Sequence, residues 1–208
     1  FGAPGSISPV DGSIITPGSG YGLPAFQAVK RYAYGSRSYY RPIYKLISGS
    51  VVVTRNGTPV AVGSGAGEIA IDVDTGQITF VADATRAVTG VTVGATTQVQ
   101  LATAMTGTVV TDRIYLTGLG GADAALLNGL SHEVTTIVGT TYTLATDTAG
   151  KTITASGNAF LYPQDDDVIA MTAQFHVPVR FNTDEFPWTV VAGKPTDQLV
   201  ESGSIPLL

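Results

Sequence analysis

Cysteine is absent from the 208-residue sequence, which rules out disulfides, thiolate metal ligands and cysteine nucleophiles. Charged residues are scarce at 13% of the chain, against about a quarter in a typical soluble domain. No apolar run approaches the roughly 18 residues that a membrane-spanning helix needs, so no membrane span is expected. Hydrophobic residues still make up 44% of the chain, enough for a core. The composition predicts a folded protein whose surface suits coverage by neighbours.

Negative charge is in modest excess, with 11 Lys and Arg against 16 Asp and Glu and a formal charge of −5. No overall basic field attracts phosphates, so no nucleic-acid partner is expected. The chain opens on Phe1 rather than Met, and its first residues lack the charged start and apolar run of a secretory signal. We therefore expect a processed chain or part of a longer one.

In the first part of the chain, residues that interrupt regular structure, such as Pro and Gly, alternate with short runs of residues that favour β-strands. Residues 1–22 are rich in Pro, Gly and Ser, which predicts an extended arm or linker. Beyond it, Asn56-Gly57 supplies both positive φ angles of a type I′ hairpin turn. A further hairpin is predicted around Gly35-Ser36. Residues 23–85 are therefore predicted to form the first part of an outer β domain.

The amino-acid composition changes between residues 86 and 162, where Thr, Gly and Val alternate in short runs. Strands about 8 to 12 residues apart predict an inserted β module, a small barrel or sandwich. The helix candidate is the segment 121–130, one or two turns long.

Strand alternation resumes over residues 169–181, where Pro178 requires a sheet edge or a bulge. Residues 163–208 are predicted to complete the outer domain, with an irregular tail after Pro187. The predicted fold class is all-β: an outer β-sandwich or barrel-like domain of hairpins, interrupted by a small inserted β-barrel module.

Two short motifs match fragments of known active sites, and each also matches a turn. Asp74-Thr75-Gly76 is the tripeptide of aspartic proteases, where two such loops share one proton, but the chain holds one copy. Gly150-Lys151-Thr152 matches the end of a phosphate-binding loop, but its flanks favour strands on both sides. Both are predicted to be hairpin turns.

Carboxylates and histidines give no convincing metal site. Asp165-Asp166-Asp167 offers the oxygens that a hard cation prefers, although such a run is more often a solvated loop. His132 and His176 fall in different predicted modules, and His132, next to Glu133, is predicted to be a polar surface residue. No nucleophile, base and orienting group can be proposed together. We expect no enzymatic activity, no cofactor and no metal.

Tyrosines and cations concentrate between residues 30 and 45. Such mixtures occur at protein interfaces and in grooves for single-stranded nucleic acid, and the acidic total favours a subunit interface. On the later strand, Arg180 is expected to pair with Asp184 or Glu185. The candidate interface residues are Tyr32, Tyr34, Tyr39, Tyr40, Arg41, Tyr44, Val177, Pro178, Arg180 and Phe181.

Several segments stand in an order that is similar to a known family. They are Phe26-Gln27-Ala28-Val29-Lys30-Arg31-Tyr32, Tyr40-Arg41-Pro42-Ile43, Asp72 to Phe80, and Phe175-His176-Val177-Pro178-Val179-Arg180-Phe181-Asn182-Thr183-Asp184. They resemble the distal-tail-type tail proteins of phages and gene transfer agents, over roughly residues 25–81 and 173–184. His176 and Asn182 depart from that pattern, each replacing an acid, which implies a local difference in interface or ion pairing. The family usually has a further segment upstream.

The insertion resembles a small β module of phage proteins named after the half-domain beside the catalytic cysteine of ubiquitin-activating enzymes. That half-domain is an accessory module, so the likeness implies no chemistry. The carriers are Leu116-Thr117-Gly118-Leu119, Leu127-Asn128-Gly129, Tyr142-Thr143-Leu144, Asp147-Thr148 and Gly150.

Together the resemblances imply a structural protein of a virion tail tip, assembled in the host cytoplasm. Its implied partners are further copies of itself in a ring, a hexamer by resemblance, together with a tail tube protein and a tip hub protein, with the insert projecting outward. The alternative is a host-surface glycan-binding module or adhesin, in which Tyr115 and Tyr142 of the insert contact a polysaccharide.

Overall fold

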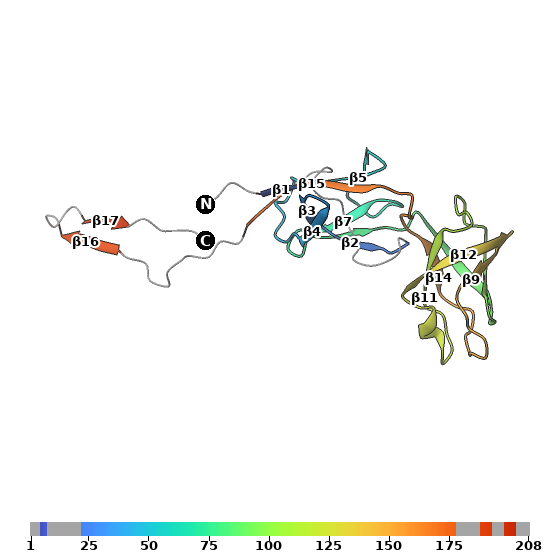
Figure 1. Cartoon of the computed structure of the whole chain (residues 1–208). Helices are drawn as coiled ribbons and strands as arrows, with labels where there is room; N and C mark the ends of the chain where they lie inside the picture. The colour runs from blue at the N-terminus through green and yellow to red at the C-terminus, as the bar shows by residue number, and fades with distance from the viewer. Residues whose placement is uncertain (1–4, 8–21, 178–187, 193–197, 203–208) are drawn as a thin grey trace.

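The computed structural model describes residues 5–7, 22–177, 188–192 and 198–202 (Figure 1). This part of the chain contains no α-helix and consists of antiparallel strands with a single 3-10 turn. The fold class is therefore all-β, as the sequence predicts. The strands outside the barrel are β1 (Gly5–Ile7), β2 (Ala25–Gln27), β3 (Val29–Tyr34), β4 (Arg37–Pro42), β5 (Val52–Arg55), β6 (Thr58–Pro59), β7 (Ile69–Asp72), β8 (Gln77–Phe80) and β15 (Ile169–Phe175), followed by β16 (Trp188–Ala192) and β17 (Gln198–Ser202).

Two antiparallel sheets pack face to face in the outer part of the molecule. One sheet has the strand order β1-β15-β5-β6 and the other the order β2-β8-β7. Apolar side chains on alternate positions of both sheets meet between them, where the rings of Phe26 and Phe80 touch edge to face at 5.4 Å between centroids. This sandwich core contains Phe26, Ile69, Ile78 and Phe80 from one sheet and Val53, Ile169, Met171, Ala173 and Phe175 from the other.

The predicted turns of the outer part are confirmed. Asn56 and Gly57 have φ angles of 52° and 80° between β5 and β6, as a type I′ turn requires. Asp74-Thr75-Gly76 links β7 to β8, and Asp72 Oδ1 accepts hydrogen bonds from the backbone N–H groups of Asp74 and Thr75. Gly76 has a φ of 69°, and a Cβ there would collide with the carbonyl oxygen of Ile43. Glycine is therefore required at this turn for backbone reasons.

The inserted module is a closed six-stranded barrel with the strand order β10-β13-β12-β11-β14-β9. Alternate residues point inward, as in β10, where Thr97, Val99 and Leu101 are buried. Inward-facing Thr97 donates its hydroxyl to Thr146 O, so its polarity is satisfied. The barrel strands are β9 (Ala84–Thr92), β10 (Thr97–Leu101), β11 (Arg113–Thr117), β12 (Leu130–Val138), β13 (Thr141–Leu144) and β14 (Asn158–Leu161).

The barrel interrupts the sandwich between β8 and β15, which belong to different sheets. After the barrel, β15 returns the chain to the first sheet, where Ile169–Thr172 pair antiparallel with Val52–Arg55 of β5. The Arg55 guanidinium holds the exit and return segments together, because it donates to both oxygens of Asp83 and to Asp167 Oδ2. Gln164 adds a second tie by bonding the backbone N–H and C=O of Arg113 in β11.

Hydrogen-bond donors at this junction favour the ionised form of the Asp167 carboxylate. Burial of Asp167 raises the pKa of its carboxyl, but hydrogen bonds from Arg55, the Gln164 N–H and Asn56 outweigh the burial and leave the pKa below its ordinary value. An aromatic cluster lies next to it: the Tyr115 ring meets Phe160 and Tyr162 edge to face, at 6.4 and 5.7 Å between centroids. Ion pairs and apolar packing thus both join the barrel to the sandwich.

Within the predicted arm, Gly5–Ile7 pairs with Ala173–Phe175 as an added edge strand, a pairing that the sequence did not predict. Two sequence expectations are wrong. The tail after Pro187 is not irregular, because β-favouring residues 188–192 pair with 198–202 as a hairpin. The Gly150 turn lies in a loop between β13 and β14, which do not pair with each other, so it is not a hairpin turn.

The expected short helix is a single 3-10 turn, Ala124–Leu126. The strand predicted over residues 169–181 is described as far as Phe175, and its continuation from Pro178 lies outside the described residues.

Candidate interaction surface

The β3–β4 hairpin is poorly covered by the rest of the sandwich region. Among the described strands, β3 and β4 pair only with each other. Their register runs from Val29 opposite Pro42 to Tyr34 opposite Arg37. Five tyrosines along the hairpin and at its base are exposed, and Tyr34 at the turn is 91% exposed. Exposed aromatic side chains in such a group are typical of protein interfaces. The exposed tyrosines are Tyr32, Tyr34, Tyr39, Tyr40 and Tyr44.

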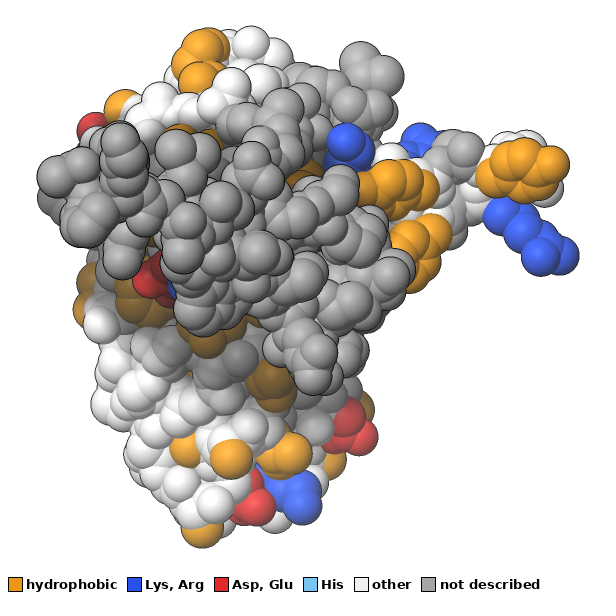
Figure 2. Space-filling model, turned by 90° about the vertical axis from the view of Figure 1, so that its left-hand side faces the viewer, with side chains coloured by type: hydrophobic (Ala, Val, Ile, Leu, Met, Phe, Trp, Pro, Cys, Tyr) orange, Lys and Arg blue, Asp and Glu red, His pale blue; other side chains and the backbone are white. Residues whose placement is uncertain are grey.

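The hairpin carries charge of one sign. No Asp or Glu occurs between residues 12 and 67, while Lys30, Arg31, Arg37, Arg41 and Lys45 all fall on or next to the hairpin. The Lys30 ammonium lies 5.7 Å from the centre of the Tyr32 ring, within cation–π range. In Figure 2 the hairpin projects from the body with hydrophobic and basic side chains along it. The cations and the tyrosines therefore form one continuous surface.

A small pocket of about 210 Å³ lies at the base of the hairpin. It forms where the end of β4 meets the end of β15, because Ile43 N donates to Ala28 O and His176 N donates to Lys45 O. Phe175 contributes to its floor from the sandwich core. The pocket is lined by Arg41, Pro42, Ile43, Tyr44, Lys45, Phe175 and His176.

The structure thus brings together two segments that the sequence singled out separately. Arg41 and Tyr44 lie around the pocket with Phe175, and Val177, which is exposed, follows two residues later. Candidate interface residues Pro178, Arg180 and Phe181, with the expected ion pair of Arg180, lie outside the described residues. The described interface candidates therefore occupy one end of the sandwich.

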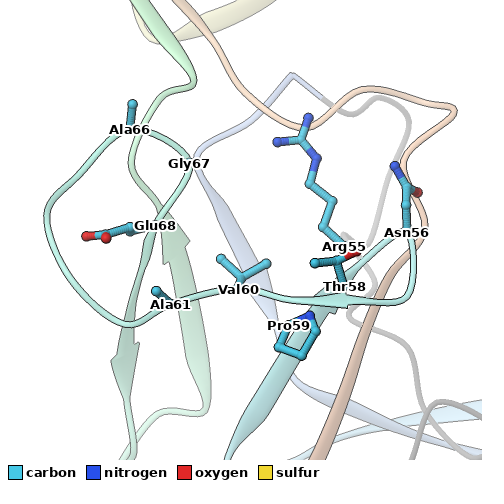
Figure 3. A pocket seen from close by; sticks show the side chains of 9 residues that line it. All are labelled: Arg55, Asn56, Thr58, Pro59, Val60, Ala61, Ala66, Gly67 and Glu68. Carbon is cyan, nitrogen blue, oxygen red and sulfur yellow. The ribbon is translucent and has the colours of Figure 1, made fainter.

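A larger groove of about 480 Å³ runs between the β5–β6 hairpin and the loop that precedes β7 (Figure 3). Its two charged side chains are already engaged. The Arg55 guanidinium donates hydrogen bonds to Asp83 and Asp167, and Glu68 Oε2 accepts a hydrogen bond from Gly65 N at 2.6 Å. The groove offers a ligand no uncommitted charge on either side chain.

Neither of the two aromatic residues expected to contact a glycan is fully exposed on the barrel surface. Tyr142 is 1% exposed, and its hydroxyl accepts a hydrogen bond from Met105 N at 2.7 Å inside the barrel. The expectation for Tyr142 is wrong, because its position on β13 faces inward. Tyr115 is half-buried in the junction cluster between Phe160 and Tyr162.

His132 and Asp167 also differ from their predicted surroundings. His132 is 5% exposed, with Nε2 3.0 Å from Leu127 O and Nδ1 2.7 Å from Thr146 Oγ1, so it is a core residue rather than a surface one. Burial lowers the pKa of its imidazole. Asp165 and Asp166 are exposed as predicted, but Asp167 is buried because Arg55 neutralises it. In the part of the chain that the structure describes, no cluster of three potential metal ligands occurs.

The residues that sequence reasoning missed are those of the junction. Arg55, Asp83 and Asp167 lie far apart in the chain, and nothing in their local patterns marks them as partners. A faint signal exists in Arg55 itself, the only cation in residues 46–85.

Comparisons with family models, with curated proteins and with solved structures found no match to this chain. No helix among the described residues is long and apolar enough to cross a membrane. The class that the fold and surface define is an all-β protein with an inserted barrel and an exposed aromatic, basic hairpin.

Proposed function

We propose that this protein is a structural subunit of a virion tail tip, a ring-forming protein of the distal-tail type that joins a tail tube protein to a tip hub protein. The observation that carries the proposal is the β3–β4 hairpin, which presents five exposed tyrosines among cations and pairs with no other described strand. A surface of this kind is costly to leave in water and stabilises contacts between subunits. The sequence resemblance supplies the ring and its hexameric copy number.

The barrel fits the role of a module carried outside the ring. It is inserted between β8 and β15, and β15 still pairs with β5, so the sandwich sheet continues past the insertion. Domain insertions of this kind are tolerated where both ends of the insert lie close together. The Arg55 bridge to Asp83 and Asp167 holds those two ends.

Glycan binding by the barrel is not favoured. Sugar sites use exposed aromatic rings, and the three aromatic residues of the barrel strands, Tyr115, Tyr142 and Phe160, are all at least half-buried. An enzymatic role likewise has no support in the described residues, since the Asp74-Thr75-Gly76 turn serves the backbone.

Mass photometry of the purified chain, followed by negative-stain electron microscopy, tests the proposal. We expect one closed ring of fixed copy number. A double variant Tyr34→Ser/Tyr39→Ser should lose the ring and keep its unfolding temperature, because both side chains are exposed. Val138→Ser removes an equally exposed apolar side chain from the barrel and should keep the ring. A wild-type chain that stays monomeric at its highest soluble concentration would contradict the proposal.

A further inference from the structure

A second surface of mixed character lies at the junction between barrel and sandwich. Val109 and Val110 are 60% and 48% exposed on the loop before β11. The Asp112 carboxylate folds back onto this loop and accepts a hydrogen bond from Val109 N at 2.7 Å. Asp165 and Asp166 are exposed on the return segment. These five residues are named the junction patch.

The carboxylates of the junction patch act on one another. Burial raises the pKa of Asp112, and the neighbouring charges of Asp166, Asp167 and Asp165 raise it further. Asp167 is neutralised by Arg55. Asp112 and Asp166 place negative charge beside exposed aliphatic side chains, whereas the β3–β4 hairpin is positive beside exposed aromatic ones. The two surfaces are complementary in charge, and both carry apolar area.

The hairpin and the junction patch lie at opposite ends of the same strand. β15 begins at Ile169, directly after the return segment with Asp165 and Asp166, and ends at Phe175 in the pocket at the hairpin base. Its seven residues span roughly 20 Å at 3.3 Å per residue. In Figure 1, β15 runs from the barrel side to the β1 side of the sandwich. Within one copy the two surfaces are therefore held apart.

From this placement we infer that the β3–β4 hairpin of one copy docks on the junction patch of the next copy, head to tail. Two complementary surfaces at opposite ends of a rigid body produce a heterologous contact, and repetition of that contact closes into a ring when the rotation between copies allows it. The tyrosines cover Val109 and Val110 while the hairpin cations face Asp166 and Asp112. This inference rests on the proposed function and names the contact that builds the ring.

Charge reversal tests the contact with two full-length variants. Arg37→Glu reverses an exposed charge on the hairpin, and Asp166→Lys reverses an exposed charge on the patch. Each variant alone should lose self-association by roughly tenfold or more, because like charges then face each other. An equimolar mixture should assemble again, because the Glu introduced in one chain meets the Lys introduced in the other and the two remaining wild-type surfaces also match.

Matched controls carry the same charge changes elsewhere. Lys151→Glu and Glu133→Lys alter exposed barrel residues, and both should assemble like the wild type. Mass photometry measures every sample, and thermal unfolding confirms that each variant is folded. A hairpin-to-hairpin contact would leave Asp166→Lys fully assembled, which would overturn the inference while the ring stands.

Two further results separate the claims. If both single variants fail and their mixture also fails, the two surfaces do not meet each other, and the inference is wrong. If the wild type itself is monomeric, the proposed function falls first. Recovery of assembly in the mixture alone supports the head-to-tail contact.

Discussion

Arg55 donates from Nη2 to Asp167 Oδ2 over 2.6 Å, although the two residues stand 112 positions apart in the sequence. The same guanidinium donates to Asp83, which lies directly before β9, where the chain enters the barrel. Asp83 precedes the inserted barrel and Asp167 follows it. The Arg55 side chain of β5 therefore holds together the two segments that connect the barrel to the sandwich. Interactions with both carboxylates, that with Asp167 foremost, raise the pKa of Arg55 above its ordinary value, so the ion pairs stabilise the charged guanidinium.

Arg55→Met should destabilise the fold. The substitution leaves Asp167 buried with its charge unpaired, and the loss of one partner from such a pair costs about 2–4 kcal/mol. Urea unfolding at pH 7 measures the change through the midpoint. Lys45→Met is the matched control, since the Lys45–Asp74 pair is exposed at both ends and its loss should leave the midpoint within error. Equal midpoints for the two variants would show that Arg55 stabilises the fold no more than an exposed ion pair does.

Stability of the barrel should fall between pH 7 and pH 5 because of His132. Leu127 O can only accept a hydrogen bond, so Nε2 carries the proton and Nδ1 is left to accept from Thr146. Burial lowers the pKa of the folded imidazole below its ordinary value of 6.5. The unfolded chain then takes up a proton first, and stability present above pH 6.5 is lost as the pH falls toward the folded pKa.

Two variants check that assignment. His132→Gln removes the titrating group and should flatten the slope of unfolding temperature against pH between 7 and 5. His176→Gln changes the other, exposed histidine and should keep the wild-type slope. A histidine NMR titration gives the folded pKa directly, and a value of 6.5 or above for His132 would refute the prediction.

Local sequence signals were sufficient for the hairpin turns of the sandwich and for the all-β class. Asn56-Gly57 and Asp74-Thr75-Gly76 are turns because backbone geometry at two or three consecutive residues decides them. Long-range partners were not predictable in the same way. Whether Tyr142 or His132 faces a core depends on barrel closure, which no local window contains. The pairing of Gly5–Ile7 with β15 also needed the sheet edge to be known.

The candidate surface was predictable in composition and only partly in place. Alternating tyrosines and cations marked the β3–β4 hairpin from sequence alone, because an uncovered strand pair shows its side chains on both faces. The meeting of Arg41 and Tyr44 with Phe175 was not visible, since it depends on how β4 ends beside β15. The junction patch was missed because its acids and valines lie on two separate loops.

Gly76→Ala should destabilise the sandwich strongly. The added Cβ would meet the Ile43 carbonyl, and the φ of 69° is unfavourable for any L side chain, so we expect a loss of about 3 kcal/mol or more. Gly49→Ala is the control, because Gly49 has a φ of 78° with open space around it. Its cost should stay at about 1–2 kcal/mol from the backbone alone. Urea midpoints compare the two, and equal losses would mean that the Ile43 contact is relieved by a small shift.

Tyr142→Phe should weaken the barrel without affecting any surface function. The hydroxyl of Tyr142 accepts from Met105 N at 2.7 Å inside the core, and leaving that buried N–H unpaired costs about 1–3 kcal/mol. Tyr115→Phe is the control, because the structure gives the Tyr115 hydroxyl no hydrogen bond among the described residues. Thermal unfolding should separate the two variants, and hydrogen exchange at Met105 should quicken only in Tyr142→Phe. If instead Tyr142→Phe keeps full stability but loses retention on a host polysaccharide column, the buried position of Tyr142 is wrong, and the barrel is the glycan-binding module rather than a carried domain.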